Sequence, residues 1–290
     1  MQTIPASELP LSNGDKAVYH LALQPEQLAD KIVMVGDPAR VMMLGEMLDS
    51  QECKVEHREY ITITGTYKGK RVTILSHGMG TGNIDIVMNE LDALANVDFK
   101  TRTIKPEKKS LTIVRVGTCG GLQPNTPLGT FVLSEKSMGF DGVLNFYAGR
   151  NEVCDVELEK EFVKQVNFSS LHASPYVAIS NKELLGRINQ GDMVGGVTIS
   201  ASGFFGPQGR VVRIPLDDPE LNSKIESFEF KGQKITNFEM EGSLVLGLSS
   251  LMGHKATVVC CVVANRLDKG MNVDYNQRIK ELATKVLDRI

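Results

Sequence analysis

Residues 111–121 read LTIVRVGTCGG. Apolar and β-branched residues dominate the first half of this stretch, which is typical of a buried β-strand, and a glycine-rich turn is expected to follow at 117–121. One residue does not fit the pattern, because Arg115 carries a guanidinium that stays charged at any ordinary pH. Burying that charge without a partner is very costly. The stretch therefore predicts a strand that meets a negatively charged group at Arg115.

Strand-like and helix-like segments alternate on both sides of this stretch. The valine-rich segment 256–265 is typical of a central strand covered on both faces. Further strands are expected at 31–37, 71–78, 129–136, 195–202 and 234–241, helices at 38–49, 82–94, 241–253 and 275–290, and a surface connection at 100–110. This alternation predicts an α/β fold. We expect a single domain over 1–290, with a central mixed, largely parallel sheet flanked by helices and with residues 1–17 as an N-terminal extension.

The composition limits the possible classes of function. A chain of 290 residues with a net charge of -3 does not suggest a nucleic-acid binder, and no apolar run reaches the length of a membrane span. Residues 1–15 lack the basic start and apolar core of a secretory signal. The five cysteines are scattered, which favours free thiols in a reducing cytoplasm. The histidines form no metal-binding pattern, so no metal or other cofactor is expected, although a structural monovalent cation near Glu59 and Ser76 is left open.

Glycine-rich turns are expected where three of these strands end, after 31–37, 71–78 and 111–116. Ligands gather at the carboxyl ends of strands in such folds, and glycine turns expose backbone N–H groups that suit anions. Arg40 and Arg115 lie near these turns, and Arg58 lies in the sequence EHREY. Three guanidiniums that converge on one site would suit phosphate. A dinucleotide site is disfavoured, because GMGTG does not match the G-x-G-x-x-G pattern.

Six motifs follow one another along nearly the whole chain. They are YHLAL (19–23), VGDPARV (35–41), HRE (57–59), RVGTCGG (115–121), FEMEGS (238–243) and VVANR (262–266). In this order they resemble the nucleoside phosphorylase family and, within it, the uridine phosphorylases. The resemblance implies cleavage of a nucleoside by inorganic phosphate, which acts as a co-substrate, with no cofactor.

The resemblance also implies a role for each matching residue. The residues expected to bind phosphate are Gly36, Arg40, Arg58, Arg115 and Thr118. The residues expected to bind ribose are His20, Thr118, Met240 and Glu241. His20 and Arg58 would come from a neighbouring subunit, so a homodimer would be the smallest complete unit. Phosphate would then be the negative group that neutralises Arg115.

Base recognition is implied at two further stretches. Gln208 and Arg210 match the Gln-x-Arg pair of uridine phosphorylases, and an amide with a guanidinium can satisfy both carbonyl oxygens and the N3–H of uracil. The residues expected to bind the base are Phe204, Gln208, Arg210 and Arg266. The residues expected to act in catalysis are Arg115, Glu241, Gln208 and Arg210. One departure from the family pattern is Pro207, which stands where glycine is usual, fixes φ and removes an N–H donor.

The expected function is that of a uridine phosphorylase, which converts uridine and phosphate reversibly to uracil and ribose 1-phosphate in pyrimidine salvage. A purine nucleoside or methylthioadenosine phosphorylase is the nearest alternative, but such relatives usually carry an aspartate where this chain has Ala-Asn-Arg at 264–266. A nucleosidase would not need three arginines, because water is its nucleophile. A non-catalytic nucleoside sensor on the same fold is the third alternative, and no motif excludes it.

Overall fold

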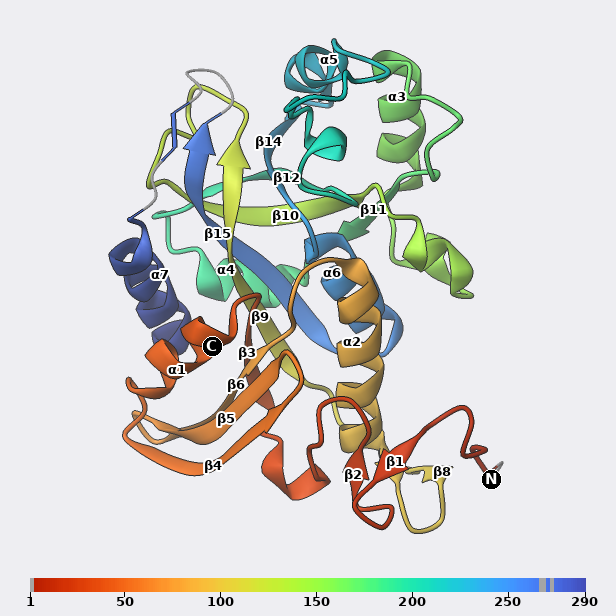
Figure 1. Ribbon diagram of the computed structural model, residues 1–290, viewed down its shortest axis with the longest axis vertical. Helices are drawn as coiled ribbons and strands as arrows, with labels where there is room; N and C mark the ends of the chain where they lie inside the picture. The colour runs from red at the N-terminus through yellow and green to blue at the C-terminus, as the bar shows by residue number, and fades with distance from the viewer. Residues whose placement is uncertain (1–2, 266–269, 272–273) are drawn as a thin grey trace.

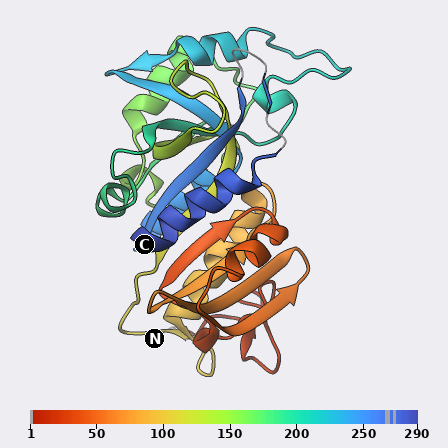
Figure 2. The same ribbon diagram turned by 90° about the vertical axis from the view of Figure 1, so that its left-hand side faces the viewer.

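The computed structural model describes residues 3–265, 270, 271 and 274–290 (Figure 1). One large sheet runs through the molecule, and helices pack along it on both sides (Figure 2). No helix in the described part of the chain is long and apolar enough to cross a lipid bilayer. The expected α/β fold with a mixed sheet is confirmed.

The main sheet has the strand order β13-β14-β12-β10-β15-β9-β3-β6-β5-β4. Its strands are β3 (Lys31–Val35), β4 (Ser50–His57), β5 (Tyr60–Tyr67), β6 (Lys70–Ser76), β9 (Thr112–Gly121), β10 (Phe131–Gly139), β12 (Val194–Ser200), β13 (Glu229–Phe230), β14 (Gln233–Glu239) and β15 (Lys255–Asn265), with β11 (Tyr176–Ile179) paired to β10. Strands β15, β9, β3 and β6 pair in parallel, as do β10, β12 and β14. The pairs β4–β5, β5–β6 and β10–β15 are antiparallel. The expected parallel pairs therefore form two groups, which meet at the antiparallel pair β10–β15 in the middle of the sheet.

Strand β14 pairs with β9 as well as with β12. Its second pairing is antiparallel and joins Asn237 to Gly121 and Phe238 to Gly120. Strands β9, β15, β10, β12 and β14 thus close into a barrel. This closure places the end of β14 beside the strand that carries Arg115.

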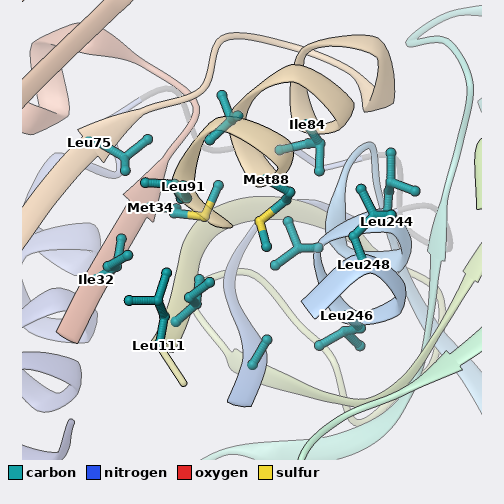
Figure 3. Close-up of a cluster of buried hydrophobic side chains, with 14 of the residues drawn as sticks. Ile32, Met34, Leu75, Ile84, Met88, Leu91, Leu111, Leu244, Leu246 and Leu248 are labelled. Atoms are coloured by element: carbon teal, nitrogen blue, oxygen red, sulfur yellow. The ribbon is translucent and has the colours of Figure 1, made fainter. Parts of the chain in front are cut away.

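Alternate residues of the central strands face two helical layers, as the two-residue period of a strand requires. In β3, Ile32 and Met34 pack toward α2 and α6, whereas Val33 and Val35 pack toward α1 and α7. Figure 3 shows the first cluster, in which methionine and leucine side chains of α2 and α6 meet the sheet. The helices are α1 (Pro38–Gly45), α2 (Thr81–Asn96), α3 (Val156–Val166), α4 (Lys182–Ile188), α5 (Leu221–Ser227), α6 (Gly242–Leu251) and α7 (Asn276–Arg289). The prediction that 256–265 is covered on both faces is confirmed, because β15 contributes side chains to both clusters.

The predicted turn at 117–121 is wrong, since β9 continues to Gly121. Gly117 pairs with Cys260 of β15, and Gly121 pairs with Asn265. Glycine is needed here for close approach, because a β-carbon on Gly121 would stand 2.3 Å from the backbone oxygen of Thr126. The glycines therefore mark crowding inside a strand and not a change of direction.

The hairpin of β4 and β5 was not predicted. Strand β4 lies at the edge of the sheet and is largely exposed and polar, so it lacks the apolar pattern of a buried strand. The helix expected over 38–49 ends earlier, at Gly45. The N-terminal segment is packed on the domain: β1 (Leu11–Ser12) pairs with β2 (Ala17–Val18), and Ile4 packs against the cluster under α2.

Candidate active site

A cleft of about 670 Å³ opens where β3, β6 and β14 end and beside the second half of β9. Residues that were predicted from separate motifs line this one cavity: Gly36, Arg40, Arg115, Thr118, Phe204, Gln208, Arg210, Met240 and Glu241. The structure therefore brings together the residues expected to bind phosphate, ribose and base within one chain, apart from three that are discussed below.

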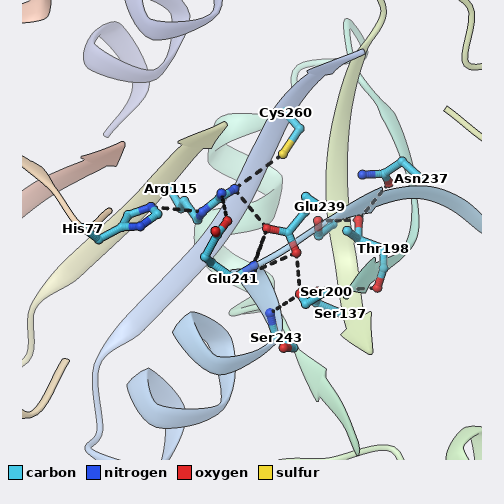
Figure 4. Close-up of polar contacts among 12 residues, drawn as sticks. His77, Arg115, Ser137, Thr198, Ser200, Asn237, Glu239, Glu241, Ser243 and Cys260 are labelled. Carbon is cyan, nitrogen blue, oxygen red and sulfur yellow. Dashed lines mark hydrogen bonds and ion pairs between the residues drawn. The ribbon is translucent and has the colours of Figure 1, made fainter. Parts of the chain in front are cut away.

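Arg115 is only 4% exposed, and each of its guanidinium nitrogens meets an acceptor (Figure 4). Nε donates to Nε2 of His77 at 3.2 Å. Nη1 lies 3.1 Å from Oε2 of Glu239, and Nη2 donates to Oε2 of Glu241. Burial alone would lower the pKa of Arg115, but the two carboxylates raise it above its ordinary value. The negative groups that meet Arg115 in this structure are glutamates of the chain itself, and contact of Arg115 with phosphate stays a prediction.

Gly117 makes room for this arrangement. A β-carbon at that position would stand 2.3 Å from Nη1 of Arg115. The two residues lie two positions apart on β9, so their side chains would point to the same face of the strand. Gly117 is therefore needed for the guanidinium of Arg115 to fit against the strand.

Glu239 is a residue of the cleft that sequence reasoning missed. Its carboxylate accepts hydrogen bonds from the backbone N–H groups of Glu241 and Gly242, both at 2.9 Å, where α6 begins. A negative charge is favoured at a helix N-terminus. The hydroxyl of Ser200 also donates to it. The signal in the sequence was the Glu-x-Glu spacing at 239–241.

Glu241 joins two parts of the cleft wall. One carboxylate oxygen takes the hydrogen bond from Arg115, and the other accepts from the backbone N–H of Gly80 at 2.7 Å. Gly80 precedes α2 and has a φ of 85°, a conformation that favours glycine. The carboxylate is therefore fixed in place between β9 and the start of α2.

The loop after β3 offers a second positive group close to Arg115. Asp37 caps α1 by accepting a hydrogen bond from the backbone of Ala39 at 2.9 Å. Arg40 follows on the first turn of this helix and lies over the ring of Tyr275, 5.6 Å from its centre. Gly36 approaches the neighbouring loop closely, because Gly78 donates a backbone hydrogen bond to it at 3.1 Å. An arginine and a helix N-terminus together favour an anion.

Three of the four residues predicted to bind the base, Phe204, Gln208 and Arg210, form one connected group. Gln208 is buried, and its amide oxygen accepts a hydrogen bond from Nη1 of Arg210 at 2.7 Å. The guanidinium carbon of Arg210 lies 3.7 Å from the centre of the Phe204 ring. Pro207 sits in the one-turn helix Gly206–Gln208, near its start, where the missing N–H is tolerated. The departure at Pro207 therefore leaves Gln208 on the cleft wall.

Two of the predicted residues that the structure describes, His20 and Arg58, are not among those that line the cleft. Nδ1 of His20 lies 2.7 Å from Oε1 of Glu90 on α2, and Arg58 lies over the ring of Tyr19. Arg266 lies outside the described residues.

A monovalent cation was left open near Glu59 and Ser76, and these two residues are joined by a hydrogen bond. Across the described ranges, no group of three or more His, Cys, Asp or Glu side chains is arranged to hold a metal. The hydroxyl of Ser76 donates to the backbone oxygen of Glu59 at 2.9 Å and accepts from the backbone N–H of Ile61 at 2.8 Å.

Comparison with known proteins places this chain in a family. Residues 30–290 match the model of the Phosphorylase superfamily. The uridine phosphorylase of Thermococcus kodakarensis is 28% identical over 261 residues, which cover 86% of this chain and 78% of that protein. A purine nucleoside phosphorylase of Roseobacter denitrificans is 34% identical over 116 residues, which cover 40% of this chain and 44% of that protein. A Trypanosoma brucei nucleoside phosphorylase described as showing uridine phosphorylase activity has a TM-score of 0.84 and 28% identity, with 97% of each chain covered.

The chain therefore belongs to the Phosphorylase superfamily. Within that family, both uridine phosphorylases and purine nucleoside phosphorylases resemble it over most of its length, since a purine nucleoside phosphorylase of Aliivibrio fischeri is 26% identical over 90% of this chain.

Proposed function

We propose that this protein is a uridine phosphorylase, a pentosyltransferase that converts uridine and phosphate reversibly to uracil and ribose 1-phosphate. One observation carries the proposal. Arg40 and Arg115, which suit phosphate, share one cleft with Gln208 and Arg210, which suit the edge of uracil. The similarity to uridine phosphorylases over most of the chain supports it.

In this proposal the cleft holds phosphate against C1′ of the ribose. Gly36, Arg40 and Thr118 bind the phosphate together with Arg115, whose guanidinium is charged at any ordinary pH and is flanked by two carboxylates. Holding both reactants in one cavity removes much of the entropic barrier to their reaction. Glu241 is fixed by Arg115 and Gly80 and presents a carboxylate to the ribose hydroxyls, and Met240 packs against the sugar.

The chemical step is a substitution at C1′. A phosphate oxygen forms a bond to C1′ as the bond from C1′ to N1 of uracil breaks, and the electron pair of that bond passes to the base. Arg210 and Gln208 stabilise the charge that develops on the uracil oxygens, while phosphate stabilises the cationic character of the ribose. The uracil anion then gains a proton through water, and the ribose 1-phosphate releases the proton that the attacking hydrogen phosphate carried, so that no net proton is consumed. No covalent intermediate with the protein is required.

Uracil release from uridine, with and without inorganic phosphate, tests the proposal directly. We expect release only when phosphate is present, and none from inosine or methylthioadenosine assayed in parallel. Release of a purine base would show that the pocket around Gln208 accepts a different base. Release without phosphate would make the protein a nucleosidase, and binding of uridine without turnover would make it a sensor.

The proposed site is completed by a second copy of the chain. His20 and Arg58 are outside the cleft of their own chain, which supports their acting in that of a neighbour. A homodimer is the smallest assembly that can do this, with one shared site per subunit. The free state of all five cysteines supports a cytoplasmic location, which fits a role in pyrimidine salvage.

Mixing two inactive variants tests the shared site. We expect Arg58→Ala and Arg210→Ala each to have little activity alone. When the two are unfolded and refolded together, half of the dimers are mixed, and each mixed dimer has one intact site. Activity is then expected to recover to about a quarter of the wild-type value. If the mixture is no more active than its components, Arg58 does not act across an interface.

A further inference from the structure

His77 lies directly after β6, next to Arg115 of the cleft wall, and it is completely buried. Its backbone N–H donates to the oxygen of Val35 at 2.9 Å, at the end of β3. The next residue, Gly78, is tied to Gly36 in the same way. A β-carbon on Gly36 would stand 3.6 Å from Cε1 of His77, so the imidazole lies against the loop proposed to bind phosphate.

The imidazole acts as a hydrogen-bond acceptor. Nε of Arg115 donates to Nε2 of His77 at 3.2 Å, and an arginine has no acceptor, so Nε2 must be unprotonated (Figure 4). The proton of a neutral imidazole is then on Nδ1. Burial, followed by the charge of Arg115, lowers the pKa of His77 well below its ordinary value, which agrees with a neutral ring.

The Arg115 side chain is thereby held from opposite ends. Glu239 and Glu241 take its two terminal nitrogens at the start of α6, and His77 takes Nε beside the loop of Gly36. The carboxylates alone would leave the guanidinium free to pivot about the nitrogens that they hold. The bond to His77 fixes its plane and keeps it next to the phosphate loop.

A role in packing alone does not explain why this residue is a histidine. Nδ1 of His77 is buried and makes no hydrogen bond of ordinary geometry among the described residues, although the backbone of Gly78 lies near enough to oppose the lowering of the pKa of the ring. An apolar side chain of similar size would fill the space without that cost. What the histidine adds is a neutral acceptor for Arg115, where a carboxylate would bring a third negative charge.

We propose that His77 is a positioning residue, which orients Arg115 for phosphate through the hydrogen bond at Nε2. This inference rests on the proposed phosphorolysis. It assigns His77 no contact with uridine, so its removal should affect the use of phosphate and leave the binding of uridine nearly unchanged.

Two amide variants separate the acceptor from the space that it fills. In His77→Gln the side-chain oxygen reaches about as far as Nε2, whereas in His77→Asn the same amide is one methylene shorter. We expect His77→Asn to lower kcat/KM for phosphate by up to about a hundredfold, because a misplaced Arg115 holds phosphate in a less reactive geometry, and to leave the KM for uridine nearly unchanged. His77→Gln should regain most of the loss. The rise in Tm caused by inorganic phosphate should shrink in His77→Asn and return in His77→Gln.

His254→Asn is the matched control, because His254 is also buried but contacts Leu111 and Asp92, away from Arg115. We expect it to lower stability without changing the KM for phosphate. Equal phosphate kinetics in His77→Asn and wild type, or equal losses in His77→Asn and His77→Gln, would overturn the proposal. Failure of the wild-type protein to use phosphate would instead refute the proposed function, whatever the variants do.

Discussion

Arg115→Met is expected to lower the free energy of unfolding by about 3–5 kcal/mol and to abolish phosphorolysis. The substitution fills a similar volume but leaves the carboxylates of Glu239 and Glu241 buried beside each other without a positive partner. Removing one member of a buried ion pair typically costs this much, because the remaining charge stays out of water. Urea denaturation of the variant and the wild type measures the difference.

The loss of stability in Arg115→Met should depend on pH. In the intact protein, burial raises the pKa of Glu241 above its ordinary value, and Arg115 opposes that shift. Without Arg115 the pKa in the folded state rises further. A carboxyl with a raised folded-state pKa is protonated more readily in the folded than in the unfolded protein, so stability falls as pH rises through that range. We therefore expect the deficit to be smaller at about pH 5 than at about pH 8.

A second substitution separates stability from activity in this variant. Arg115→Met combined with Glu241→Gln removes one of the two unpaired charges. It should regain part of the lost stability and none of the activity, because the guanidinium is still missing. If Arg115→Met alone unfolds at the same urea concentration as the wild type, the buried carboxylates do not need Arg115 for stability.

The anomaly at Arg115 was visible in the sequence, but its partners were not. Glu241 lies 126 residues further along the chain, and only the closure of β14 onto β9 brings the two together. No local pattern contains that pairing. The need for a negative partner followed from one residue, whereas the identity of the partner depended on the topology of the whole sheet.

Other features of the structure also differ in whether a local sequence pattern could predict them. The central strands were predictable because burial on both faces makes them continuously apolar, as in β15. The edge strand β4 was not, because exposure removes that pattern. The pair of Gln208 and Arg210 was predicted through a family resemblance, and the structure adds the hydrogen bond between them. Glu239 was missed although its spacing from Glu241 was a signal, and His77 was missed as well, because their partner Arg115 lies far from both along the chain.

Under the proposed reaction, Arg210→Ala is expected to lower kcat/KM for uridine by about a hundredfold to a thousandfold, the usual cost of losing one donor to a developing negative charge. Arg210 also contacts its neighbours in the base site, since its guanidinium binds the amide oxygen of Gln208 and lies over the ring of Phe204. Arg210→Lys keeps the charge but loses the planar fork, so an intermediate loss is expected.

The contact between Arg210 and Gln208 predicts that their effects are not additive. Arg210 fixes the orientation of the Gln208 amide, so Gln208→Ala should cost much less in the Arg210→Ala background than in the wild type. Steady-state kinetics of the two single variants and the double variant measure this coupling. Losses that add fully would mean that the two side chains act on the base independently. A near-normal kcat/KM in Arg210→Ala would show that Arg210 does not recognise the base. Another hydrogen-bond donor in the cleft would then have to stabilise the leaving group.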